Sequence, residues 1–165
     1  MGVRQRRIQA NYLKVGAKYE FLGTGFQTLD EKPSPKTTSK RYVNDASASQ
    51  SITSYEWSSD YEADQIQSNK AIEYIVNIGE MCKTGADAET EYLIVDLDKE
   101  ANTEGYRTRK FNVAIQVDSF DNNDGELQCK GSFLGLGDPV EGTVTIDGSS
   151  KEVTFTEGFE AKATE

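Results

Sequence analysis

Polar and apolar side chains alternate through residues 54–64, which read SYEWSSDYEAD. Successive side chains of an extended strand point to opposite sides, so this pattern predicts a strand with two unlike faces. One face is mainly aromatic and holds Tyr55, Trp57, Ser59, Tyr61 and Ala63. The other face is rich in carboxylates and holds Ser54, Glu56, Ser58, Asp60, Glu62 and Asp64. Because like charges repel, we expect the acidic face to stay in water and the aromatic face to enter the core.

A helical period follows directly. Ile72, Ile75, Val76 and Gly79 recur at the spacing of one helix face, which predicts a helix over residues 65–79. Asp64 is the expected N-cap, and Gly79 is the expected terminating residue.

Strand patterns dominate the rest of the chain. The expected strands cover residues 19–26, 89–99, 107–120, 140–146 and 152–156, and a further strand carries Leu127, Cys129 and Phe133. The sequence DNNDG at residues 121–125 predicts a hairpin turn between two of them. We therefore expect a mainly β protein: one domain over residues 1–165, built as a β-sandwich or barrel with one flanking α-helix.

Two segments lack a clear place in such a core. Residues 1–18 are polar and basic, which predicts an N-terminal arm that needs a docking surface. Residues 27–50 contain Pro33 and Pro35 and are rich in small polar residues, which excludes a central strand. We expect this second segment to be a long loop or an extended hairpin.

Charge is distributed unevenly along a chain whose net charge is -10. Residues 1–42 hold nine basic and three acidic residues, whereas residues 55–104 hold three basic and thirteen acidic ones. A basic amino-terminal region on an acidic body could bind the body of a neighbouring copy, or it could be a flexible arm without a partner. The acidic strands should repel a phosphate backbone rather than bind it.

The sequence offers little for catalysis or metal binding. It contains no histidine, and Cys82 and Cys129 are isolated, which excludes the common zinc sites and the Ser-His and Cys-His nucleophiles. The DNNDG turn does not fit an EF-hand loop. A glycosidase-type carboxylate pair remains possible in principle, with Asp96 the one acidic residue in an apolar setting. We expect no enzyme activity, no metal and no cofactor.

Membrane and secretion signals are also not evident. No apolar run is long enough to span a membrane, and no apolar segment follows the basic amino-terminal residues. We therefore expect a protein made in the cytosol that does not bind membranes.

The order and texture of these elements resemble the major tail tube proteins of tailed bacteriophages, particularly those of Firmicutes hosts. The resemblance covers nearly the whole chain and rests on these stretches: RQRRIQANYLKV, YEFLGTGFQTLDEKPSPKTTSKRYVNDASASQSITSYEWSSDYEADQI, AIEYIVNIGE, EYLIVDLDKE, RKFNVAIQVDSF, DGELQCKGSFLGLGDPVEGT and KEVTFTEGF. It implies a structural virion protein of the tail, made in the host cytoplasm. Six copies would form a ring, and rings would stack into a hollow tube through which genomic DNA passes without specific binding. Further implied partners are the tape measure, tail terminator and distal tail proteins.

The resemblance also implies roles for particular residues. The candidates for the channel lining are Ser58, Glu56, Asp60 and Glu62, and the opposed set Asn112, Gln116 and Asp118 competes with them. The candidates for contacts between subunits or rings are Arg4, Arg6, Arg7, Lys32, Pro33, Pro35, Lys36, Lys40 and Arg41. We expect that reversing the three amino-terminal arginines to glutamate, or deleting residues 1–15, weakens polymerisation but leaves the folded domain intact.

Two alternatives stay open. The chain could form the tube of a tailocin or gene transfer agent, which has the same architecture. It could instead be a β-sandwich module that binds carbohydrate or a cell surface. That second alternative predicts an exposed aromatic patch that includes Trp57 or Tyr61.

Overall fold

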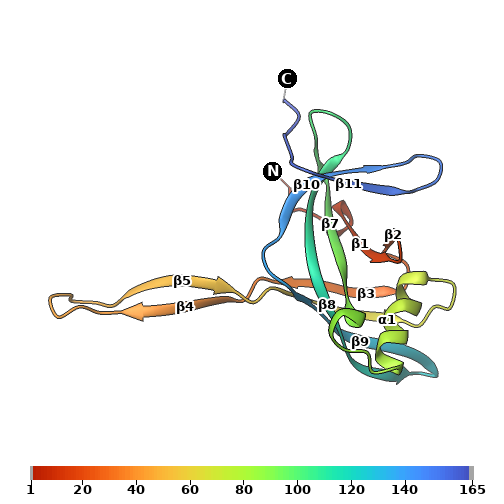
Figure 1. Cartoon of the computed structure of the whole chain (residues 1–165), viewed down its shortest axis with the longest axis horizontal. Helices are drawn as coiled ribbons and strands as arrows, with labels where there is room; N and C mark the ends of the chain where they lie inside the picture. The colour runs from red at the N-terminus through yellow and green to blue at the C-terminus, as the bar shows by residue number, and fades with distance from the viewer. Residues whose placement is uncertain (1, 164–165) are drawn as a thin grey trace.

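The structure is a computed structural model that describes residues 2–163 (Figure 1). Strands make up most of it, with one α-helix and two short 3-10 helices. In chain order the elements are η1 (Arg6–Ile8), β1 (Gln9–Val15), β2 (Lys18–Phe21), β3 (Phe26–Lys32), β4 (Pro35–Lys40), β5 (Ser49–Tyr55), β6 (Ser58–Asp64), α1 (Lys70–Glu80), η2 (Gly85–Ala88), β7 (Glu89–Glu100), β8 (Tyr106–Asn123), β9 (Glu126–Gly135), β10 (Val140–Ile146) and β11 (Val153–Glu157).

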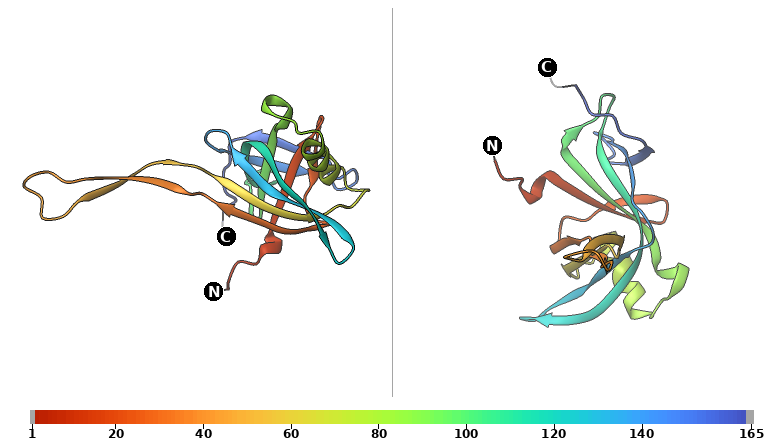
Figure 2. Two further views of the ribbon diagram at one scale, coloured as in Figure 1. Left: turned by 90° about the horizontal axis from the view of Figure 1, so that it is seen from below. Right: turned by 90° about the vertical axis from the view of Figure 1, so that its left-hand side faces the viewer.

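One curled antiparallel sheet forms the body. Its strands run in the order β2-β1-β7-β8-β9-β6-β3, and β10 joins through β8 and carries β11. The 18-residue strand β8 organises the sheet, because it pairs with β9 along one part and with β10 along another. The sheet curls into a half-barrel (Figure 2). The expected mainly β fold with one flanking helix is therefore confirmed, in the form of a single curled sheet.

Apolar residues fill both sides of the sheet around β7. Tyr92 and Ile94 join the larger core, which α1 covers. Leu93 and Val95 point the other way and pack with Val144 of β10 in a second, smaller core. Nothing in the local sequence of β7 shows that the β10–β11 hairpin covers this second face.

Helix α1 begins later than predicted. Asp64 is the last residue of β6, and Asn69 is the N-cap. The Asn69 side chain accepts hydrogen bonds from the backbone N–H groups of Ala71 at 3.0 Å and Ile72 at 3.2 Å. Those two bonds satisfy donors that no helical carbonyl can reach, which fixes the start of the helix.

Gly79 lies inside α1 and does not end it, contrary to the prediction. The helix continues to Glu80. A Cβ on Gly79 would lie 2.7 Å from side-chain atoms of both Val117 and Phe120. The glycine therefore allows the last turn of α1 to approach β8 closely.

The predicted amino-terminal arm is largely a strand of the sheet. β1 pairs with β2 on one side and β7 on the other, and Leu13 is fully buried. Tyr12 and Ala10 are buried on the opposite side. Because both faces of β1 are covered, its sequence QANYLKV shows no simple alternation, and the strand escaped prediction. The expectation that residues 1–15 can be removed without harm to the fold is wrong.

Residues 35–55 form an extended hairpin that projects from the body (Figures 1 and 2). β4 and β5 pair from Pro35 with Tyr55 to Lys40 with Ser49, and every side chain in both strands is exposed. The structure thus has a hairpin where the sequence allowed either a loop or a hairpin. Residues 27–32 belong instead to β3, which is an edge strand of the sheet.

Candidate functional site: the outer sheet face and the projecting hairpin

Strand β6 places its carboxylates as the alternation predicts. Ser59, Tyr61 and Ala63 are buried, whereas Asp60 and Glu62 on the other face are only partly covered. Glu56 differs from the other channel candidates because it lies between β5 and β6 and is exposed. Ser58 begins β6 and is partly covered.

Lysines from neighbouring strands partly neutralise this acidic row. Lys32 of β3 donates a hydrogen bond to Asp60, and Lys130 of β9 lies 3.7 Å from Glu62. Ser132 of β9 also donates to Asp60, at 2.7 Å. The hydrogen bond from Lys32, and then that from Ser132, lower the pKa of Asp60. The carboxylates of β6, which have no basic residue beside them in the sequence, therefore acquire basic neighbours in the folded sheet.

The two sets of residues that compete for the channel lining, one on β6 and one on β8, lie on the same face of the sheet. Asp60 of β6 is the register partner of Ser132 on β9, and Ser132 is the partner of Gln116 on β8. Register partners in adjacent antiparallel strands share a face of the sheet. Asn112 and Asp118 of β8 are exposed like Gln116, and Gln116 donates a hydrogen bond to Asp118. We call this surface of β3, β6, β9 and β8 the outer face.

The basic residues expected at subunit contacts occupy three different places. Lys32 lies on the outer face, and Lys36 near the hairpin root pairs with Glu56 at 3.2 Å. Lys40 and Arg41 lie at the far end of the hairpin, where β4 passes into the turn. Pro33 and Pro35 flank the break between β3 and β4 at the root.

The amino-terminal arginines do not form a common free patch. Arg4 pairs within its own chain, at 3.2 Å from Asp96 and 3.0 Å from Asp98. Arg6 donates to the Gln9 carbonyl at 3.0 Å and to the Asn11 side chain at 2.6 Å. Arg7 is exposed. Reversing all three charges would therefore disturb the folded domain, contrary to the expectation, because Arg4 neutralises a buried carboxylate.

The hairpin root is fixed to the body by Trp57. Its ring stacks on Phe111 at a centroid distance of 3.9 Å, and its indole N–H donates to Glu31 at 2.9 Å. Arg109 donates two hydrogen bonds to the same carboxylate, at 2.6 and 3.0 Å. Burial raises the pKa of Glu31, but the hydrogen bonds from Arg109 and Trp57 outweigh this effect and lower it.

These contacts bear on the carbohydrate-binding alternative. Tyr61 is 2% exposed, and Trp57 packs against the core. Neither ring is available for a flat binding patch, so the aromatic residues that the alternative needs are committed to packing.

Asp96 was singled out in the sequence because its apolar neighbours were expected to raise its pKa, but in the structure its pKa is lowered. It is 1% exposed, and it accepts hydrogen bonds from Arg107 at 2.9 Å, Arg4 at 3.2 Å and Gln9 at 3.3 Å. Burial raises its pKa, but the hydrogen bonds outweigh burial and leave the pKa below its usual value. A carboxyl group held ionised in this way is a poor general acid at neutral pH.

Within residues 2–163 no group of three or more acidic, histidine or cysteine side chains could hold a metal ion. Among the same residues, no helix is both long and apolar enough to cross a membrane.

Sequence reasoning missed the lysine partners of the acidic face. Lys32 and Lys130 come from strands on either side of β6, and no local sequence pattern predicts the order of the strands in the sheet. Lys130 could have been placed beside Glu62 only by pairing the strand that carries Leu127, Cys129 and Phe133 with residues 58–64, in the register that matches their alternating apolar residues.

Comparison with known proteins adds no relative. No protein-family model matches the chain, and no curated protein matches it.

Proposed function

We propose that this protein is a structural subunit that assembles with copies of itself into the hollow tail tube of a tailed bacteriophage. Six copies would form each ring, rings would stack, and DNA would pass along the channel without specific binding. The observation that carries the proposal is the projecting hairpin of β4 and β5, whose side chains are all exposed.

A hairpin of this kind has little to stabilise it in a lone molecule. An isolated two-stranded hairpin is marginally stable in water, because it has no hydrophobic face to bury. Here the apolar side chains of Tyr42, Val43 and Ile52 are 66%, 109% and 58% exposed. A partner that covers the hairpin would remove that surface from water, which supports self-assembly.

The open edges of the sheet support the same proposal. β2 and β3 end the main path of the sheet, so each has a partner strand on one side only among the described residues. Unpaired edges favour pairing with another chain. Edge-to-edge pairing of six copies would close half-barrels into one continuous inner barrel and remove the exposed edges.

The outer face is suited to line a DNA channel. It presents Asp60, Glu62 and Asp118, and the whole chain has a net charge of -10. Repulsion between such a surface and phosphates would let DNA slide. Lys32 and Lys130 reduce the repulsion without reversing it, because the carboxylates on this face outnumber them. The tape measure, tail terminator and distal tail proteins are the further partners in this proposal.

Electron microscopy of the purified protein over a range of concentrations tests the proposal. We expect rings or tubes with a central hole. The matched control replaces residues 36–54 by Asn-Gly, which removes the hairpin beyond the Pro35–Tyr55 pair and should abolish assembly. Particles that stay monomeric at every concentration, even when nucleated by tail components, would rule the proposal out.

A further inference from the structure

An acidic groove with an apolar floor lies between α1 and the β8–β9 turn. Its volume is about 660 Å³. The apolar floor includes Ile66, Val76 and Leu127, and the acidic rim includes Glu73, Glu80 and Glu126. The Leu127 residue is 59% exposed, so it offers apolar surface that a partner can cover.

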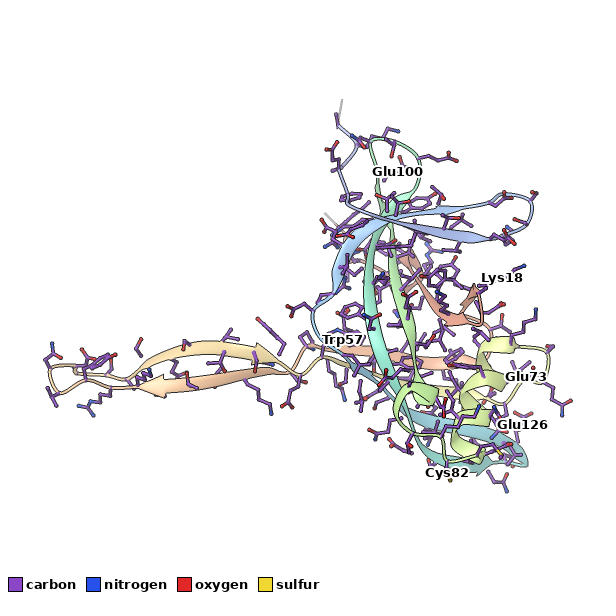
Figure 3. All side chains as sticks on the ribbon, viewed as in Figure 1. Lys18, Trp57, Glu73, Cys82, Glu100 and Glu126 are labelled. Atoms are coloured by element: carbon purple, nitrogen blue, oxygen red, sulfur yellow. The ribbon has the colours of Figure 1, made fainter. Side chains whose placement is uncertain are left out.

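The rim of the groove is uncompensated negative charge. Glu73, Glu80 and Glu126 form no ion pair within residues 2–163, and no lysine or arginine lines the groove. Figure 3 shows Glu73 and Glu126 at the end of the molecule that faces away from the hairpin. A basic segment with apolar side chains would complement both the rim and the floor.

The hairpin tip has that composition. Lys40 and Arg41 enter the turn, and Tyr42 and Val43 follow as two of the most exposed apolar side chains in the structure. Asp45 holds the turn: its carboxylate accepts from the Tyr42 N–H at 3.0 Å, and its carbonyl accepts from Arg41 at 3.2 Å. Tyr42 and Val43 are therefore presented at the end of the hairpin with two cations beside them.

We propose that the hairpin tip of one copy docks in the groove between α1 and the β8–β9 turn of a second copy. Tyr42 and Val43 would cover Leu127 and Val76, and Lys40 and Arg41 would face the carboxylates of the rim. The inference rests on the proposed self-assembly and names the surface that receives the hairpin.

A hairpin tip that docks in this groove must belong to a second copy. The hairpin and α1 lie on opposite sides of the body (Figures 1 and 3), so the tip cannot reach the groove of its own chain. The contact joins two different surfaces of the subunit, so the copy that donates its tip keeps a free groove and the copy that receives it keeps a free tip. Such head-to-tail contacts produce closed rings or open stacks, depending on the rotation between copies.

A second groove, between the β1–β2 and β10–β11 hairpins, is larger but carries the wrong charge. Its volume is about 980 Å³. It is lined by four basic residues, Arg7, Lys18, Lys70 and Lys151, and by two acidic ones, Glu20 and Glu152. Lys18 already pairs with Glu152 at 3.1 Å. The remaining positive charge would repel Lys40 and Arg41, so the charge pattern selects the groove beside α1.

A cross-linking experiment tests the contact directly. Val43→Cys and Leu127→Cys are made separately in chains that also carry Cys82→Ser, with tags of different length. Cys129 can stay, because it is buried and burial raises the pKa of its thiol to about 11. We expect a mixed disulfide when the two variants are combined under mild oxidation. The matched control, Lys151→Cys in place of Leu127→Cys, places the thiol at the second groove and should not cross-link to Val43→Cys.

A charge exchange tests the electrostatic part. Lys40→Glu with Arg41→Glu, or Glu73→Lys with Glu126→Lys, should each raise the concentration needed for half-maximal assembly by at least about tenfold. Combining both pairs should restore most of the loss. All of these side chains are exposed, and circular dichroism verifies that each variant is folded.

The outcomes separate this inference from the proposed function. Tubes that form normally while the mixed disulfide is missing and the reversed charges have no effect would overturn the tip-and-groove contact and leave the tube function standing. The mixed disulfide without rings or tubes would support the contact and count against the tube. Loss of assembly in both charge variants without recovery in the combination would overturn the contact.

Discussion

At the scale of single residues, Asp96 shows how the fold treats a buried charge. Its carboxylate is 1% exposed, yet Arg107 and Arg4 both lie within 3.2 Å of it. An isolated buried carboxylate would be very costly, and paired hydrogen bonds offset that cost. Arg4 precedes β1, Asp96 lies in β7 and Arg107 lies in β8. The cluster therefore fixes the segment before β1 to the sheet.

Arg107→Ala should destabilise the protein strongly. The variant leaves Asp96 buried without its closest cation, and breaking a buried pair in this way costs about 3–5 kcal/mol. The measurement is the free energy of unfolding from urea denaturation. The control is Lys162→Ala, which removes an exposed ion pair with Glu100. The side chains of Lys162 and Glu100 are 66% and 57% exposed. An exposed pair is worth at most about 1 kcal/mol, so equal losses in the two variants would contradict our account of Asp96.

Acid should remove part of the protein's stability for the same reason. The folded protein lowers the pKa of Asp96, so the unfolded chain takes up its proton first as the pH falls. The stabilising contribution is therefore complete above the unfolded pKa of about 4 and is lost as the pH drops through the lower, folded pKa. We expect the free energy of unfolding to fall between neutral pH and pH of about 3. Asp96→Asn should reduce that fall, and an unchanged pH dependence would show that other groups cause it.

At the scale of elements, the body and the hairpin should behave independently. β4 and β5 place no side chain in either core, and Trp57 fixes the root to the body through Phe111 and Glu31. The hairpin is therefore held at one end only.

Replacing residues 36–54 by Asn-Gly should leave the thermal stability of the monomer nearly unchanged. The substitution keeps Trp57 and its contacts and removes no residue of either core. Changes at such surface positions usually alter stability by less than about 0.5 kcal/mol each way. Deleting residues 2–15 gives the contrast, because it removes β1 and its buried Leu13 from between β2 and β7. Differential scanning calorimetry should show a normal transition for the first variant and none for the second. Similar behaviour of the two variants would contradict the division into body and hairpin.

The sequence predicted those elements whose residues alternate against one covered face. Strand β8 is the best case, because Phe111, Val113 and Ile115 are buried while Asn112 and Gln116 are exposed. The same logic failed for β1, where both faces are covered and the alternation disappears. The strand β7 was predicted over residues 89–99, but the burial of both its faces was not. The start of α1 was misplaced because Asp64 satisfies the local pattern of an N-cap, while its pairing with Gln128 of β9 keeps it in a strand.

At the scale of the whole molecule, the charge of the candidate surfaces could be predicted from the sequence, but the residues that lie next to them could not. The acidic row of β6 was visible, and the lysines that partly neutralise it come from strands whose order depends on the entire sheet. The groove beside α1 was invisible for a related reason. Glu73 belongs to a helix and Glu126 to a distant hairpin, and only the packing of α1 on β8 brings them to one rim.

Asp45 gives the hairpin a property that matters for the speed and strength of docking. Its bonds to Arg41 and Tyr42 hold the turn in one conformation before any partner arrives. A preorganised ligand loses little conformational entropy on binding, so more of the contact energy remains as affinity. The Asp45→Ala variant would free the turn, so the turn would have to become ordered each time it binds. Subunits would then join more weakly even though every residue that touches the partner is unchanged.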